Sequence, residues 1–232
     1  MTAMSVPFSG QLVNFLAALL LLIAFAMLSQ RRIVSLIHLY ATQGFVLAVS
    51  TLIVAHSTNQ VHLVYSALLT LALKVVALPW LLHRLIERLN VRWDVETLIN
   101  IPTTMIVGIG LVVFAFNLAL PISQLSGTVI RATLGIALAS VLLSFLMMLT
   151  RRKAVSQVIG FLAMENGLLF AATSATYGMP MVVELGIALD VLIGALILGI
   201  FFFQIRETFD SLDLRHMERL RDEKTAPEES QP

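Results

Sequence analysis

The sequence predicts an all-α integral membrane protein with seven transmembrane helices. Of its 232 residues, 58% are hydrophobic and only 12% are charged, and the mean hydropathy is +0.91, which lies outside the range of soluble domains. The apolar residues form seven runs of about twenty, the length that a helix needs to cross a hydrocarbon core of about 30 Å. None of the runs alternates polar and apolar residues as a barrel strand would, so helices are expected throughout.

The expected spans follow one another with short connections. They are Leu12–Leu28, Ile33–Val54, His62–Leu82, Ile101–Leu120, Ala132–Leu149, Ala154–Ala175 and Pro180–Phe203. No Lys or Arg precedes the first run and no small-residue cleavage site follows it. We therefore expect a retained span there and not a signal peptide.

Basic residues mark one side of the predicted bundle. Lys and Arg follow the first, third, fifth and seventh runs, whereas the opposite loops at 56–60, 121–127 and 177–179 contain none. Because Lys and Arg collect in cytoplasmic loops, the N-terminus is predicted outside and the C-terminus in the cytoplasm. Two residues depart from this pattern: Arg131, expected to snorkel at the outer mouth of its helix, and Lys74, which lies inside a run.

A weak internal repeat relates the first three runs to the last three. Its matching pieces are Arg31-Arg32 with Arg151-Arg152, Thr42-Gln43-Gly44 with Glu165-Asn166-Gly167, and Ala72-Leu73-Lys74-Val75 with Ala188-Leu189-Asp190-Val191. One linking run between the units starts the second unit on the same face as the first, so the sequence predicts a parallel 3+1+3 repeat.

This repeat divides the chain into four expected parts. A three-helix unit (1–90) is followed by a linking helix (91–125), a second three-helix unit (126–206) and a cytoplasmic tail (207–232). The tail is predicted to be disordered after about residue 225, where its composition becomes polar and proline-containing.

Four charged residues lie inside the apolar runs: Lys74, Glu165, Glu184 and Asp190. A charge at bilayer mid-depth costs about 2.5–3.5 kcal/mol even on lenient insertion scales, so such residues mark a proton or ion path, or pair with one another. At about 1.5 Å per residue, Glu165 and Asp190 both fall near mid-membrane. Glu184 lies about 120° round the helix from Asp190, so the two acids face different neighbours.

The balance of these charges favours proton handling. Three carboxylates and one ammonium would be prohibitive in a dry interior if all were ionised. Either at least one carboxyl stays protonated, or water and a neighbouring subunit supply the balance. A structural interpretation stays open, in which Lys74 forms a single pair with Asp190 or Glu165 and locks the two repeats together.

The composition excludes several other function classes. Zero cysteines exclude disulfides, thiolate-bound clusters and Cys-ligated zinc, and a net charge of +1 argues against nucleic acid as a partner. No phosphate loop, dinucleotide fingerprint, nucleophile elbow or zinc-spaced set is present. We expect no catalytic centre, metal or cofactor in this chain, and the position of His83 beside Arg84 at the membrane edge disfavours a haem held with His38.

Three pieces of the sequence resemble the hydrogenase-4 component E family of membrane subunits. They are Met164-Glu165-Asn166-Gly167, the stretch from Val183 to Asp190, and Lys74 followed by Pro79. The resemblance covers nearly the whole chain. The last three runs are also similar to the K subunit of bacterial complex I and to the C subunit of multisubunit cation/proton antiporters. By this likeness Glu165 and Asp190 match the two membrane carboxylates of those subunits, although complex I has glutamate in place of Asp190.

The resemblance implies a non-catalytic accessory subunit of a formate hydrogenlyase-type nickel–iron hydrogenase or related respiratory complex, in a bacterial or archaeal plasma membrane. Its proton relay would comprise Glu165, Asp190, Glu184 and Lys74. Its partners would be antiporter-like and other membrane subunits, lipid and, indirectly, a cytoplasmic nickel–iron and iron–sulfur module. Two alternatives stay open: a free-standing SWEET-like transporter, which shares the 3+1+3 plan, and a scaffold whose charges only hold partner subunits in register.

Overall fold

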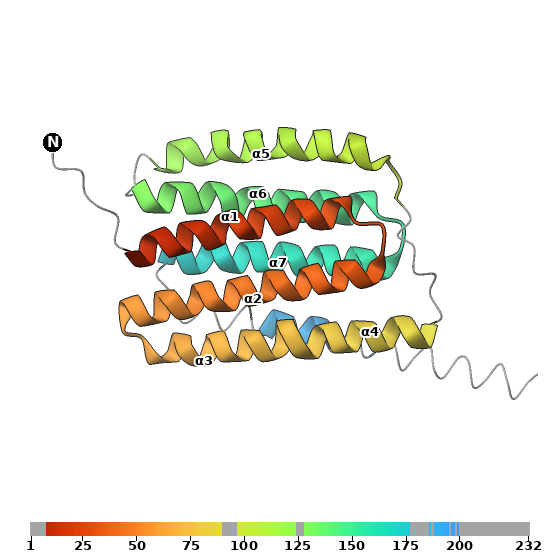
Figure 1. Ribbon diagram of the computed structural model, residues 1–232, viewed down its shortest axis with the longest axis horizontal. Coiled ribbons are helices and arrows are strands. Elements are labelled where there is room, and N and C mark those ends of the chain that lie inside the picture. The colour runs from red at the N-terminus through yellow and green to blue at the C-terminus, as the bar shows by residue number, and fades with distance from the viewer. Residues whose placement is uncertain are drawn as a thin grey trace, which may run out of the picture.

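The computed structural model describes residues 8–89, 97–123, 128–176, 186, 188–194, 196, 197 and 199. Within these ranges the chain is helical, and the extended pairing is limited to isolated bridges such as the one between Thr97 and Arg151. The elements, labelled in Figure 1, are α1 (Phe8–Ser29), α2 (Ile33–Thr58), α3 (Val61–Thr70), the π-helix η1 (Leu71–Ala77), α4 (Leu78–Leu89), α5 (Ile101–Ser123), α6 (Thr128–Thr150) and α7 (Ala154–Thr176).

Six spans in the described part of the chain are long and apolar enough to cross a membrane. Five lie in α1, α2, α5, α6 and α7, and the sixth, Val61–Glu87, runs through α3, η1 and α4 without a break. These correspond to the first six expected runs, and the chain is a multi-pass membrane protein. The seventh expected run, Pro180–Phe203, lies mostly outside the described residues, of which 188–194 are helical.

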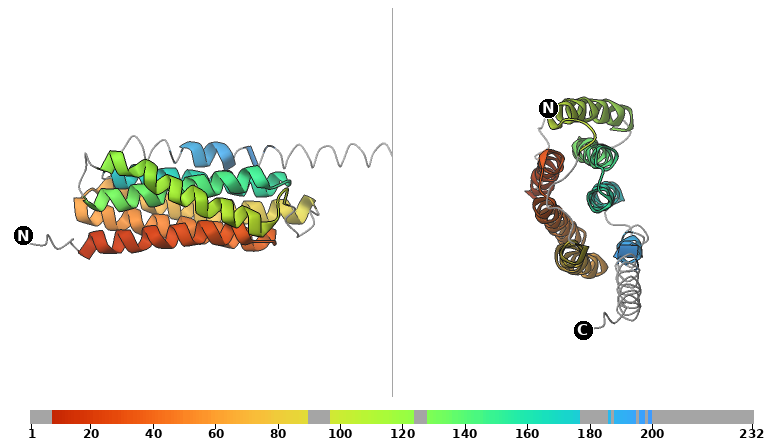
Figure 2. Two further views of the ribbon diagram at one scale, coloured as in Figure 1. Left: turned by 90° about the horizontal axis from the view of Figure 1, so that it is seen from above. Right: turned by 90° about the vertical axis from the view of Figure 1, so that its right-hand side faces the viewer.

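The helices lie side by side along one common direction. Helix α1 packs against α2 and α6, α2 also packs against α3, η1 and α7, and α5 lies against α6 and α1. The end-on view in Figure 2 shows α1, α2 and the α3–α4 rod in one row, with α6, α7 and the helical residues near 190 in a second row. Among the helices that the predicted repeat would match, α1 contacts α6 and α2 contacts α7.

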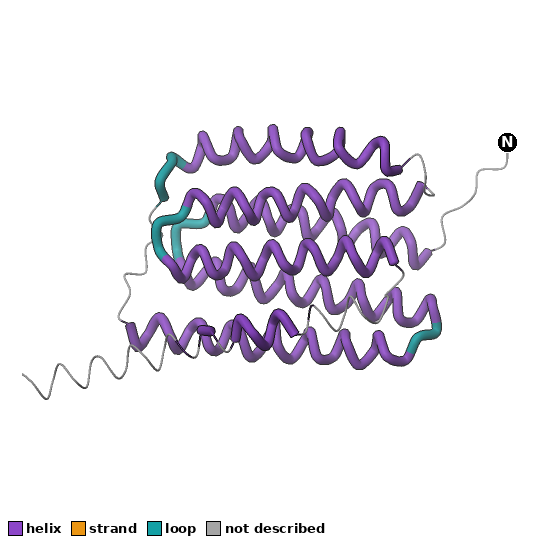
Figure 3. Tube along the Cα trace, turned by 180° about the vertical axis from the view of Figure 1, so that it is seen from behind, coloured by secondary structure: helices purple, strands orange, loops and turns teal. Residues whose placement is uncertain are grey.

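One end of the bundle carries the basic loops. The α1–α2 connection, with Arg31 and Arg32, and the α6–α7 connection, with Arg151 and Arg152, lie together at one end, and the α2–α3 connection lies at the other (Figure 3). We call the first of these the basic end. It is the side that the distribution of Lys and Arg predicts to face the cytoplasm.

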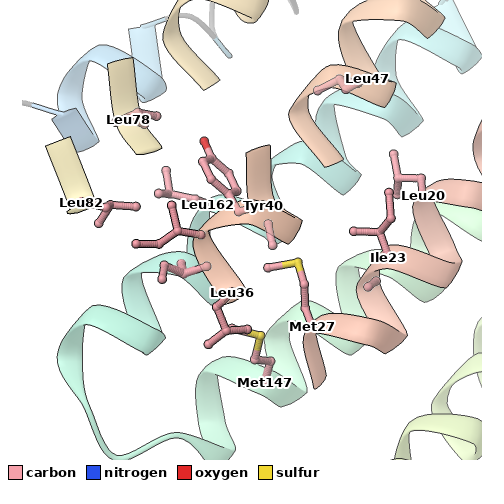
Figure 4. Close-up of a cluster of buried hydrophobic side chains, with 14 of the residues drawn as sticks. Leu20, Ile23, Met27, Leu36, Tyr40, Leu47, Leu78, Leu82, Met147 and Leu162 are labelled. Carbon is pink, nitrogen blue, oxygen red and sulfur yellow. The ribbon is translucent and has the colours of Figure 1, made fainter. Parts of the chain in front are cut away.

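Apolar side chains fill the space between the two rows. The buried cluster draws on α1, α2, α4, α6 and α7, and its members include Leu20, Met27, Leu36, Leu47, Leu82, Met147 and Leu162 (Figure 4). The outward faces are also apolar, as Ile106 and Val113 of α5 show with exposed fractions of 70% and 56%. A surface of this kind is what hydrocarbon covers in a membrane-spanning helix.

A buried arginine fastens the two rows at the basic end. Arg151 is 1% exposed, and its Nη2 atom donates hydrogen bonds to the carbonyl oxygens of Leu28 (2.8 Å) and Met27 (3.3 Å) at the end of α1. Those carbonyls lie in the last turn of α1 at the negative end of the helix dipole, so a cation is well placed there. Burial lowers the pKa of Arg151 to about 10, which leaves the guanidinium protonated at neutral pH.

Candidate functional site: a buried lysine between two carboxylates

Three of the four predicted charges meet at one point inside the bundle. The Nζ atom of Lys74 lies 2.8 Å from Oε1 of Glu165 and 3.0 Å from Oδ1 of Asp190. The exposed fractions of the three residues are 0%, 3% and 1%. Residues from η1, α7 and the helix near 190, far apart in sequence, therefore form one buried charged cluster.

Lys74 projects from a π-helix. In η1 the turn is widened to hydrogen bonds between residues five apart, so that the Leu78 N–H donates to the Leu73 carbonyl. Pro79 has no N–H with which to continue this wide ladder, and α4 resumes from there. Such π segments inside α-helices recur at functional sites, where they redirect a side chain that a regular helix would place elsewhere.

A glycine makes room for the lysine. A Cβ atom added to Gly44 of α2 would lie 2.9 Å from the Cβ atom of Lys74, closer than packed side chains allow. The two backbones can approach because Gly44 lacks that atom, as small residues permit between membrane helices. This close approach brings the base of the Lys74 side chain against α2.

The cluster has an uneven charge. One ammonium and two carboxylates carry a net charge of −1 when all three are ionised, and the surrounding side chains leave them almost no exposed surface. Burying unbalanced charge costs several kcal/mol. One added proton makes the cluster neutral, and either carboxylate has an oxygen beside the same nitrogen to receive it. The arrangement is chemically suited to bind and release a single proton.

Polar groups continue from the cluster along α2. The Nδ2 atom of Asn166 donates a hydrogen bond to Oε1 of Gln43 (3.2 Å), and both residues are fully buried. Tyr40, also fully buried, lies near enough to Asp190 and Glu165 to feel their charges. The prediction of the site missed Tyr40. The signal that would have found it is its spacing from Gln43 and Gly44, three and four residues along one helix face.

The outcome for the predicted residues is therefore mixed. Lys74, Glu165 and Asp190 come together, and Lys74 forms both of the alternative pairs at once. Glu184 lies outside the described residues. Of the histidines, His38 and His83 are exposed, and His83 lies 3.4 Å from Glu87 on the surface of α4. Among the residues that the structure places, no three His, Asp or Glu side chains gather in a way that would hold a metal ion.

Comparison with known proteins places this chain in a family. It is 33% identical over 212 residues to the uncharacterized protein Rv0085 of Mycobacterium tuberculosis, which covers 91% of this chain and 96% of that protein. The chain belongs to the Rv0085 family. No family model matches the chain, and no solved structure matches it either.

A second similarity of the Rv0085-family chain is more distant. Over 101 residues it is 27% identical to hydrogenase-4 component E of Escherichia coli, strains K12 and O157:H7, and of Shigella flexneri. The match covers 44% of this chain and 47% of each relative. It is shorter than the resemblance to that family noted in the sequence, which extended over nearly the whole chain, and it establishes a distant relation only.

Proposed function

We propose that this protein is a non-catalytic membrane subunit of a hydrogenase-4 or formate hydrogenlyase-type complex, or of a related respiratory complex, and that its buried charges take part in proton translocation. The observation that carries the proposal is the sharing of the Lys74 ammonium between Glu165 and Asp190. The distant relation to hydrogenase-4 component E supports the kind of complex.

The geometry supports a simple way of passing a proton. An arriving proton neutralises one carboxylate, and the ammonium then pairs with the other. Because both carboxylate oxygens lie within 3.0 Å of the same nitrogen, the ammonium can give one of its own protons to the ionised carboxylate and take the proton of the neutral carboxyl in return, which exchanges the acid that stays ionised. The proton can thus enter on one carboxylate and leave from the other without a bare charge in the interior. Glu184 would extend this relay along its own helix.

The proposed setting is a bacterial or archaeal plasma membrane, with seven spans and the basic end in the cytoplasm. A parallel 3+1+3 repeat is supported by the contacts of α1 with α6 and of α2 with α7. In such a repeat Lys74 and Asp190 would be equivalent positions of opposite charge. Antiporter-like subunits would flank the bundle and continue the proton path sideways.

A scaffold whose charges bind partner subunits fits the geometry less well. The three charged side chains are buried inside this chain and pair with one another. These three charges are therefore not available on the outer surface for a neighbouring subunit to recognise. Assembly with partners would rest on the apolar outer faces instead.

The test combines co-purification with proton transport. The chain, tagged at its C-terminus and expressed at native level, is purified in mild detergent, and mass spectrometry identifies the proteins that accompany it. Inverted membrane vesicles then report proton uptake for the double variant Glu165→Gln, Asp190→Asn, with Glu87→Gln on the exposed surface of α4 as the matched control. We expect hydrogenase and antiporter-like partners, assembly in both variants, and loss of proton uptake in the double variant alone. Recovery of the chain without partners, or unchanged proton uptake in the double variant, contradicts the proposal.

A further inference from the structure

Tyr40 lies between the charged cluster and the basic end of the bundle. Helices α2 and α7 both begin at the basic end, at Ile33 and Ala154. At 1.5 Å per residue, Tyr40 is roughly 10 Å along α2 and Glu165 roughly 16 Å along α7. The phenol therefore stands about one helical turn nearer to the basic end than the carboxylate does, on a helix that contacts α7.

The aromatic ring of Tyr40 accounts for its packing, and the hydroxyl group adds nothing to it. The residue is fully buried among apolar side chains that include Leu78, Leu82 and Leu162 (Figure 4). Its Oη atom has no hydrogen-bond partner among the described residues, although a buried tyrosine hydroxyl usually finds one. A phenylalanine would fill the same space without burying an unpaired polar group, so the hydroxyl calls for another explanation.

Two further buried polar atoms are unpaired in the same way. The Nε2 atom of Gln43 and the Oδ1 atom of Asn166 have no partner in the described part of the chain, although the two side chains bond to each other through their other atoms. Gln43 follows Tyr40 by three residues, so both lie on one face of α2. Buried sets of donors and acceptors of this kind hold ordered water, which makes about three hydrogen bonds in such sites.

We propose that Tyr40 is a proton-transfer residue that connects the buried charged cluster to the basic end of the bundle through ordered water. Its hydroxyl donates a hydrogen bond to water that leads to a carboxylate of the cluster, and accepts one from water on the side of the basic end. When the phenol proton passes through the first water to the carboxylate, a proton from the second water replaces it on the same oxygen, and that water takes up a proton in turn from the basic end. The phenol stays neutral, and one positive charge has moved inward. This inference rests on the proposed function, because it gives the relay its route to one membrane face.

The experiment compares Tyr40→Phe with Tyr65→Phe, whose tyrosine is 70% exposed on α3. Both variants are made in the assembled complex, and dye-linked hydrogenase activity and proton uptake by inverted vesicles are measured. We expect equal assembly and dye-linked activity, with proton uptake slowed roughly tenfold in Tyr40→Phe only. This is less than the full effect of a positioned acid–base group, since water can partly bypass it. Uptake at the rate of the original chain, or failure of Tyr40→Phe to assemble, overturns the inference.

Two further measurements distinguish a failure of this inference from a failure of the proposed function. If the double variant Glu165→Gln, Asp190→Asn abolishes uptake while Tyr40→Phe does not, the relay stands and the role of Tyr40 fails. If neither affects uptake, the proposed function fails as well. Independently of any partner, infrared spectroscopy of the full chain in lipid nanodiscs follows hydrogen–deuterium exchange of its protonated carboxyl groups. Slower exchange in Tyr40→Phe than in Tyr65→Phe is expected, and equal rates contradict the route through Tyr40.

Discussion

Replacing Lys74 with methionine removes the cation of the cluster and little else. Methionine is unbranched and flexible, so it can follow the path of the lysine stem past Gly44. Glu165 and Asp190 then face each other without the ammonium that now lies 2.8 Å and 3.0 Å from them. Breaking a buried ion pair from one side destabilises a protein by about 3–5 kcal/mol, because it leaves a charge uncompensated.

Protonation of a carboxyl group limits this loss of stability in a second way. Neutralising a carboxyl of ordinary acidity at pH 7 costs about 4 kcal/mol, at about 1.36 kcal/mol for each pH unit. Adding a proton to one of the two acids would therefore cost about as much as leaving a charge unpaired does, and we expect a loss near 4 kcal/mol. In Lys74→Met the folded state holds a proton that the unfolded chain does not, so its stability rises as pH falls. The loss of stability relative to the original chain therefore shrinks by about 1.4 kcal/mol for each pH unit from pH 7 toward pH 5.

Chemical unfolding of the purified chain in detergent, followed by helical circular dichroism, measures this loss. The matched control is the neutral triple variant Lys74→Met, Glu165→Gln, Asp190→Asn. Replacing a whole buried ion pair with neutral groups is often neutral or stabilising, so the triple variant should regain most of the stability. A loss below about 1 kcal/mol in the single variant, or a triple variant no more stable than the single one, would refute the reasoning about the shared ammonium.

Three further predictions concern the surroundings of the cluster. Gly44→Ala should cost about 1–3 kcal/mol by overpacking, whereas Gly110→Ala on α5, where an added Cβ meets nothing within 4 Å, should leave the unfolding temperature unchanged. Arg151→Met removes two charge-assisted hydrogen bonds and should cost about 1.5–3 kcal/mol. Because burial lowers the folded-state pKa of Arg151 to about 10, below its unfolded value, stability rises with pH only above about 10, and unfolding measurements in the neutral range should find a constant deficit. Gln43→Leu or Asn166→Leu alone leaves the other amide buried without its partner and should cost about 1–3 kcal/mol. A double-mutant cycle should show that the two substitutions together cost less than the sum of the two single losses.

Much of the fold could be predicted because the bilayer imposes it. The expected runs at Ile33, Ile101 and Ala154 begin at the residues where α2, α5 and α7 begin, since basic and polar loops interrupt the apolar sequence there. The predicted ends of the runs were less accurate than their predicted starts. The third run was expected to stop at Leu82, but α4 continues to Leu89 through residues whose charged heads can reach past the hydrocarbon.

The π-helix could not be predicted from local sequence. Residues 71–77 read as an ordinary apolar helix, and Pro79 alone suggests only a bend or a boundary. The widened turn at Lys74 depends on the approach of Gly44 from a different helix and on two carboxylates from distant parts of the chain. Such contacts belong to the tertiary structure, which hydrophobic periodicity does not encode.

The residues of the site could be predicted only where they carry charge. Lys74, Glu165 and Asp190 stand out because a charge inside an apolar run is costly, and their depth follows from counting residues. Depth does not give the rotation of each helix, so it left open which acid the lysine meets. Tyr40 and Gln43 gave no comparable signal, since aromatic and amide side chains are far cheaper to bury than ions.

The ratio of charges favours the proposed proton-binding role over the purely structural one among the two roles that the sequence left open for Lys74. A lysine that only links helices needs one carboxylate, and a second one would add the cost of burying another ion without adding a second cation. The structure places both acids within 3.0 Å of Nζ, so the cluster holds one acid more than a structural pair requires. That excess is what a proton-binding site needs, because the cluster then has a neutral state with the proton bound and a charged state after its release. In the proposed mechanism the two states differ in how strongly Lys74 holds each carboxylate, so proton binding would be linked to the ion pair that joins Lys74 of η1 to Glu165 of α7. Stability and proton uptake, both measured in the original chain, should therefore change together with pH.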